Sequence, residues 1–120
     1  MLTTGRQAED YAGKWLKNKR LSILEANYHS RWGEIDIVAM DDNTICFIEV
    51  RYRKSNNFGT AAESVTSSKQ QRIIRTAHAY LHEHRQYITR PARFDVITLT
   101  GSLDKPVIDW YKDAFIMNAS

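Results

Sequence analysis

Residues 33–51 read GEIDIVAMDDNTICFIEVR, and this stretch decides the fold. Two runs rich in β-forming residues, 34–40 and 44–51, flank the turn-forming residues 41–43. This spacing predicts a hairpin of two antiparallel strands. Because side chains alternate along a strand, the first strand is expected to place three apolar residues on one face, Ile35, Ile37 and Ala39.

The hairpin would bring two carboxylates together. With a two- or four-residue loop, Asp36 lies opposite Glu49, whereas a three-residue loop breaks this pairing. The same register places Glu34 opposite Arg51. Opposed Cβ atoms lie about 4.5–5.5 Å apart, and like charges there repel unless a proton or cation joins them. Since Mg²⁺ binds one or two carboxylates and leaves room for a phosphate, Asp36 and Glu49 are candidate metal ligands.

Three charged residues could complete such a site. Arg51 follows Glu49 by two positions, so it should share a face with Glu49 and could neutralise a phosphate. Glu9, on the first predicted helix, is a candidate third carboxylate. Lys69 lies in the first turn of the second predicted helix, where a cation opposes the helix dipole. That placement makes sense if Lys69 reaches an anion. The alternative is that these three residues are ordinary solvent-exposed charges with no role in a site.

Two amphipathic helices are predicted over residues 4–19 and 68–84, with capping boxes at Thr4 and Ser67. Each has one apolar stripe: Ala8, Tyr11, Ala12, Trp15 and Leu16 in the first, and Ile73, Ile74, Ala77, Tyr80 and Leu81 in the second. The three tryptophans, Trp15, Trp32 and Trp110, are expected in or near the core.

Further strands are expected at residues 21–28, 94–100 and 107–111, the first suited to a sheet edge. The hairpin implies antiparallel pairing, whereas the strand–helix–strand crossover implies a parallel pair. The sheet should therefore be mixed, in an α/β fold. Residues 53–60 should form a loop, in which Phe58 could stack on a base or pack onto its own domain.

Composition limits the class of protein. The chain has 120 residues, 42% hydrophobic and 26% charged, which suits a single globular domain over residues 1–120. One cysteine, Cys46, cannot form an intramolecular disulfide, and no apolar run suits a membrane helix or signal peptide. We therefore expect a cytoplasmic protein with no membrane partner. The net charge of +3 permits a nucleic-acid partner without requiring one.

Three motifs carry a resemblance: GEID at 33–36, FIEVR at 47–51 and RFDV at 93–96. Together they resemble the YraN family of small bacterial proteins, which is similar to archaeal Holliday-junction resolvases and the restriction-endonuclease-like superfamily. The resemblance covers nearly the whole chain and also includes Gly5, Glu9, Lys69 and Gln70. It implies a three-layer core, with a central mixed sheet flanked by helices in the order αβββαβ.

The resemblance also implies an activity, that of a metal-dependent endonuclease on structured or branched DNA. Asp36 and Glu49 would bind Mg²⁺ or Mn²⁺, and Glu9 would assist them. Cleavage of phosphodiester bonds would leave a 5′-phosphate. Resolvase-like enzymes need two sites to cut two strands, so the resemblance leaves a homodimer open.

One residue departs from the superfamily pattern, which has lysine two positions after the glutamate. Arg51 stands there, and arginine cannot act as a general base. Lys69 is a candidate to take over that role. Two further functions therefore stay open beside the endonuclease: a non-catalytic nucleic-acid-binding module that retains the fold, and a protein-interaction module using the same cleft.

Overall fold

The computed structural model describes residues 3–54 and 65–116 of the chain. Phe58 lies outside the described residues. Within them, the elements are α1 (Thr4–Asn18), β1 (Ser22–Ser30), β2 (Gly33–Asp41), β3 (Thr44–Arg53), α3 (Ser67–Glu83), the 3-10 helix η1 (Arg85–Tyr87), β4 (Ala92–Thr100) and β5 (Val107–Phe115). The predicted helices and strands are all present, and β5 is longer than expected. No helix in this part of the chain has the length and apolar character needed to cross a membrane.

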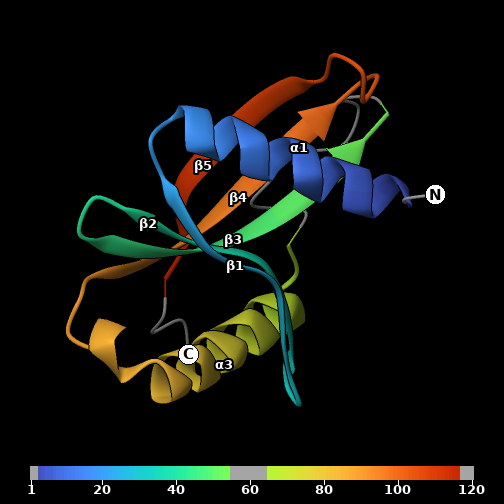
Figure 1. Cartoon of the computed structure of the whole chain (residues 1–120). Helices are drawn as coiled ribbons and strands as arrows, with labels where there is room; N and C mark the ends of the chain where they lie inside the picture. Colours follow the sequence, from blue (N-terminus) through green and yellow to red (C-terminus); the bar gives the residue numbers. More distant parts are fainter. Residues whose placement is uncertain (1–2, 55–64, 117–120) are drawn as a thin grey trace.

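The strands form one sheet in the order β1-β2-β3-β4-β5 across the described residues. Strands β3 and β4 are parallel, and the other neighbours are antiparallel. The predictions of a mixed sheet and of an edge position for β1 are confirmed. Helices α1 and α3 cover opposite faces of the sheet (Figure 1). The result is a three-layer α/β arrangement, compatible with a restriction-endonuclease-like core.

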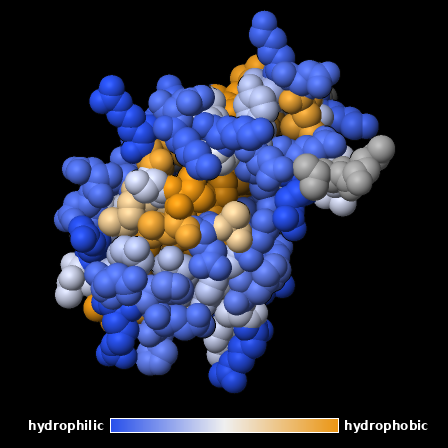
Figure 2. All heavy atoms as spheres, in the orientation of Figure 1, coloured by the Kyte–Doolittle hydropathy of each residue, from blue (hydrophilic) through white to orange (hydrophobic). Residues whose placement is uncertain are grey.

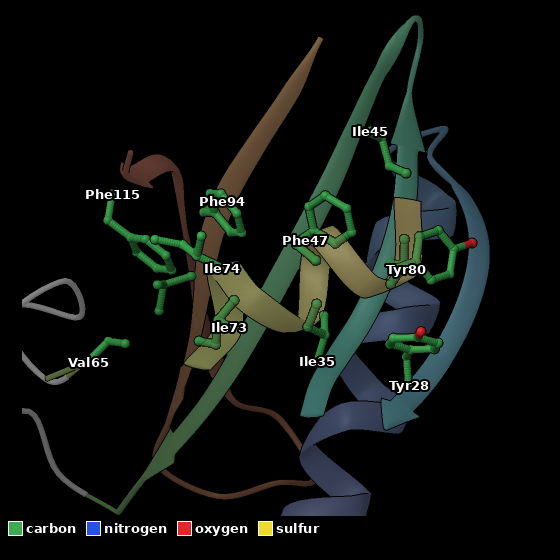
Figure 3. Packing of buried hydrophobic residues seen from close by; sticks show 13 residues of the cluster. Tyr28, Ile35, Ile45, Phe47, Val65, Ile73, Ile74, Tyr80, Phe94 and Phe115 are labelled. Atoms are coloured by element: carbon green, nitrogen blue, oxygen red, sulfur yellow. The ribbon is translucent and has the colours of Figure 1, made fainter. Parts of the chain in front are cut away.

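The core between α3 and the sheet is rich in aromatic side chains, which Figure 3 shows lying against one another. The ring of Tyr80 lies edge-on to Tyr28 and Phe47, with ring centroids 5.0 and 6.0 Å apart. Phe94 stacks on Phe47 and, at 5.0 Å, on Phe115. These contacts fix the position of α3 on the sheet, and with it the N-terminal turn of the helix.

The core beneath α1 is aliphatic. Ala8, Ala12 and Leu16 are buried against Ile37 and Ile48, as the apolar stripe predicted. The small side chains let α1 lie close to the sheet. Figure 2 shows apolar side chains gathered below α1, where β1 crosses the sheet, within a largely hydrophilic surface.

Both helix caps differ from the prediction by one residue. Thr3, not Thr4, caps α1, and its hydroxyl accepts a hydrogen bond from the Arg6 amide at 3.2 Å. Thr66, not Ser67, caps α3, and its hydroxyl accepts from the Lys69 amide at 3.1 Å. In each case a neighbouring hydroxyl residue of the same capping chemistry takes the extended conformation that an N-cap requires.

Strict alternation along β2 was a wrong expectation. Ile35 packs in the core beneath α3, whereas Ile37 and Ala39 pack beneath α1. The three residues therefore do not share a face. The change of face falls at Asp36, which lies between Ile35 and Ile37.

Candidate functional site

Asp36 and Glu49 lie where strands β2 and β3 part. Their ladder runs from Asp41 opposite Thr44 to Ile37 opposite Ile48, which is the predicted register. The ladder ends there, so the expected strand pairing of Asp36 with Glu49 does not form. The Asp36 carboxylate instead accepts a hydrogen bond from the Val50 amide at 2.8 Å. At this point the Asp36 side chain takes the place of the backbone hydrogen bonds that join β2 to β3.

The expected pairing of Glu34 with Arg51 is also absent. Glu34 instead lies opposite His29 of β1, and their side chains are 3.4 Å apart. The parting of β2 from β3 is the physical reason, because it separates the two strands over these residues. Arg51 remains beside Glu49, as described below.

The two carboxylates are buried and interact strongly. Asp36 is 7% exposed and Glu49 is 5% exposed. Burial, followed by the nearby charge of Glu49, raises the pKa of Asp36 to about 8, against the lowering effect of the Val50 amide. Glu9 and a hydrogen bond with the Glu49 side chain raise the pKa of Asp36 further. Without a cation, these effects favour the protonated form of Asp36, whose side chain hydrogen-bonds that of Glu49.

Two cations approach the Glu49 carboxylate. Nε of Arg51 and Nζ of Lys69 each lie 3.5 Å from Oε2 of Glu49. Arg51 reaches Glu49 along β3, whereas Lys69 reaches it from the first turn of α3. Both side chains are about one-third exposed, so they are also open to solvent. A buried anion with two partly exposed cations at its rim suits an incoming phosphate group.

Glu9 approaches Asp36 from α1. Its Oε1 atom is buried and has no hydrogen-bond partner among residues 3–54 and 65–116, while the Asn27 side chain hydrogen-bonds the carboxylate. Burial raises the pKa of Glu9, against the lowering effect of Arg6. Glu9 and Asp36 line the same cavity of about 200 Å³, which also borders Gly13. The structure thus places all five candidates, Glu9, Asp36, Glu49, Arg51 and Lys69, around one region.

Asn27 is a site residue that the sequence analysis missed. Its φ of 54° lies in the left-handed region, which asparagine tolerates better than most residues. Nothing in the run around it distinguishes it from an ordinary strand residue.

The RFDV motif has a structural explanation. The Asp95 carboxylate is fully buried and accepts hydrogen bonds from Nε of Arg93 at 3.0 and 3.1 Å. It also accepts from Nε1 of Trp110 at 3.0 Å and from the amide of Asp113 at 2.9 Å. Arg93 in turn donates to Asp41 at 2.8 Å. The motif therefore ties β5 and the β2–β3 turn to β4.

A metal ion at this site would have only a few protein ligands. In the described part of the chain, no three His, Cys, Asp or Glu side chains form a group that could hold a metal ion. Mg²⁺ commonly takes one or two carboxylates and keeps several waters. The buried Asp36–Glu49 pair and the hydrogen-bond-free oxygen of Glu9 meet that smaller requirement.

The fold and this site define a three-layer α/β protein with a buried carboxylate pair at the point where two central strands part. Comparison with protein families matches residues 8–99 to the uncharacterised protein family UPF0102. The chain belongs to this family, which is the YraN family, so the resemblance seen in its motifs is confirmed.

Bacterial relatives cover nearly the whole chain. A UPF0102 protein of Alcanivorax borkumensis is 43% identical over 113 residues, which span 93% of this chain and 90% of that protein. One from Nitrosomonas europaea is 43% identical over 111 residues, or 92% of each chain. One from an Enterobacter species is 45% identical over 113 residues, covering 93% of this chain and 83% of the relative.

Proposed function

We propose that this protein is a divalent-cation-dependent endonuclease that hydrolyses phosphodiester bonds in structured or branched DNA. The observation that carries the proposal is the contact between two buried carboxylates, Asp36 and Glu49, at a rim formed by Lys69 and Arg51. Burying two like charges together destabilises a fold unless a proton or cation joins them. Buried carboxylates with strongly shifted pKa values are found at functional sites more often than elsewhere.

Asp36 and Glu49 would hold the cation, Mg²⁺ or Mn²⁺, and Glu9, which lines the same cavity as Asp36, would assist them. When bound, the cation supplies polarisation of the phosphate and an activated water. The chain's own contribution is to hold these oxygens in place. The Val50 amide orients Asp36, and the Asn27 side chain orients Glu9.

Lys69 and Arg51 would stabilise negative charge on the phosphate. Both groups already lie beside a carboxylate, so a phosphate oxygen can replace that interaction at little cost in reorganisation. Lys69 supplies the compact ammonium that the Arg51 position lacks. Cutting both strands of a junction would further require two copies of the chain.

A second candidate is a non-catalytic nucleic-acid-binding module. The specific observation that favours it is that Lys69 and Arg51 both contact Glu49, so a cation must compete with two existing ion pairs. Arg51 in place of the superfamily's lysine points the same way. This module would bind DNA through the same cations without cleaving it.

The test is cleavage of labelled duplex, flap and four-way-junction DNA with Mg²⁺ or Mn²⁺. Wild type is compared with Asp36→Asn and Glu49→Ala, and with Asp42→Asn as a control for the loss of one negative charge. Asp42 is exposed in a turn with a φ of 55°, which asparagine adopts readily.

Metal-dependent cutting by wild type and Asp42→Asn, lost in Asp36→Asn and Glu49→Ala, is the expected result. Salt-sensitive DNA binding without any cutting would support the binding module instead. If cutting occurs equally in all four proteins, the activity belongs to a contaminant and the assignment of the site fails. Sedimentation of the protein on junction DNA would report whether two copies bind.

A further inference from the structure

Trp32, in the turn between β1 and β2, is more exposed than a core residue. It is 38% exposed, so the expectation that it lies in or near the core was wrong. Cζ of Arg31 lies 4.5 Å from the centroid of its ring, and Cζ of Arg75 lies 4.9 Å away. This partly exposed indole and its two guanidiniums form a positively charged aromatic platform.

Hydrogen bonds fix this turn onto α3. The Ser30 hydroxyl donates to Oγ1 of Thr76 at 3.1 Å and accepts from the Trp32 amide at 3.1 Å. Gly33 has a φ of 150°, and a Cβ atom there would lie 3.5 Å from Cβ of Arg72. The platform is therefore held in place before any ligand arrives, which lowers the entropic cost of binding.

Three arginines near Trp32 have no ion-pair partner in the part of the chain that the structure describes, whereas Lys69 pairs with Glu49. Within residues 3–54 and 65–116, no carboxylate lies at ion-pair distance from Arg31, Arg72 or Arg75. The nearest acidic residue along the chain, Glu34, lies 3.4 Å from His29 and lines the same cavity as Arg31 and Arg72. We call the set Arg31, Trp32, Lys69, Arg72 and Arg75 the Trp32 surface.

The Trp32 surface adjoins the carboxylate pair through Lys69. Trp32, Arg31, Arg72 and Lys69 line one cavity of about 390 Å³. Lys69 also lies 3.5 Å from Glu49. A polyanion in this cavity therefore meets Lys69 at the point where Lys69 meets the candidate catalytic site.

We propose that the Trp32 surface binds an unpaired segment of a nucleic-acid strand. A base stacks on the platform of Trp32 and its arginines, and phosphates contact Arg72 and Lys69. Bases within a continuous duplex are stacked on one another, so they are not available to this platform. The inference rests on the proposed function for its consequence in cleavage, namely that the preferred substrate has unpaired nucleotides beside the cut.

Binding is tested without divalent cations, so that the result does not depend on cleavage. Full-length protein is titrated with fluorescent oligodeoxythymidine and, separately, with duplex DNA in EDTA. Trp32→Ala should weaken binding of the single strand by about tenfold, and Trp32→Phe by much less, because phenylalanine still offers a ring for stacking. Duplex binding should change less than twofold. Thermal unfolding checks that each variant is folded.

A charge-matched pair separates this surface from general electrostatics. Arg72→Ala and Lys105→Ala each remove one positive charge, but Lys105 is exposed in the turn between β4 and β5, at the end of the sheet away from α3 (Figure 1). Arg72→Ala should reduce the slope of log K against log salt by about 0.7, because it removes one phosphate contact. Lys105→Ala should leave the slope unchanged.

Three results would overturn the inference. The first is wild-type affinity in Trp32→Ala, and the second is an equal loss of affinity in Arg72→Ala and Lys105→Ala. The third is competition by polyglutamate as strong as competition by oligodeoxythymidine. An absence of cleavage together with the expected Trp32→Ala loss would reject the nuclease function alone. If the protein cleaves DNA as proposed but Trp32→Ala binds the single strand as well as wild type does, only the role of the Trp32 surface is rejected.

Discussion

The Lys69 ammonium lies 3.5 Å from the Glu49 carboxylate, and the two residues come from different elements, α3 and β3. The contact exists because the aromatic core fixes α3 on the sheet and Thr66 begins the helix three residues before Lys69. Arg51, on the same strand as Glu49, approaches the same oxygen. The site therefore has two cations with different chemistry.

The first prediction distinguishes these two cations. If Lys69 supplies the ammonium of a nuclease site, Lys69→Met should lower the single-turnover cleavage rate by about 100-fold or more, the typical loss for one electrostatic donor. Arg51→Lys should change the rate by less than about tenfold, because a positive charge remains. Lys105→Met is the control for charge. A clear rise in rate for Arg51→Lys, with no loss for Lys69→Met, would assign the role to position 51.

The second prediction concerns the stability of the cation-free protein. The pKa of Asp36 is raised to about 8 in the folded state, mainly by burial and Glu49, against 3.8 for the ordinary group. Folding therefore favours the protonated form. The stability that this provides is complete below about pH 4 and is lost as pH rises toward 8.

Asp36→Asn should remove this dependence, because the amide mimics the protonated carboxyl and can still accept from the Val50 amide. In EDTA, urea unfolding should show the variant and wild type alike near pH 4. Near pH 8 the variant should be more stable, on the order of a few kcal/mol. Asp42→Asn should show the same difference from wild type at both pH values. A difference for Asp36→Asn that does not vary with pH would contradict the buried-pair account.

The third prediction links cation binding to proton release. A cation must displace the proton that Asp36 holds below about pH 8. The affinity for Mn²⁺ or Mg²⁺ should therefore rise about tenfold per pH unit up to that value and then level off. Calorimetry in buffers of different ionisation enthalpy should report about one proton released per cation near neutral pH. Binding that is independent of pH, or retained by Asp36→Asn, would exclude Asp36 as a ligand.

Much of the fold could be predicted because its signals are periodic. The apolar stripes of α1 and α3 recur at helical spacing, and the turn at residues 41–43 set the β2–β3 register. The caps were displaced by one position, because Thr3 and Thr4 have the same capping chemistry, as do Thr66 and Ser67. Strand β5 was only partly predicted, since much of it is exposed and carries a weak apolar pattern.

The site could be predicted only as far as the strand register extends. That register correctly brought Asp36 near Glu49, but the end of the ladder after Ile37 depends on tertiary packing and has no local marker. The exposure of Trp32 is likewise set by long-range contacts of its turn with α3, such as that between Ser30 and Thr76. A large aromatic residue in a sequence is by default assigned to the core.

The fourth prediction separates structural from functional motifs. Asp95 is fully buried beside Arg93 and also accepts two hydrogen bonds, from Trp110 and from the Asp113 amide, that hold β5 in place. Asp95→Ala removes one of the two carboxylates that pair with Arg93, so it should lower the free energy of unfolding by about 3–5 kcal/mol. Asp109→Ala, an exposed carboxylate on β5, should change it by less than about 0.5 kcal/mol.

The same variant should leave the candidate site intact at temperatures where it is folded, because Asp95 lies outside the Asp36–Glu49 contact. Cation affinity of folded Asp95→Ala, measured by calorimetry, should therefore match that of wild type. A variant that unfolds as readily as wild type but no longer binds the cation would place Asp95 in the site. In that case the RFDV motif would be functional, and the hydrogen bonds around Asp95 would serve to position a ligand.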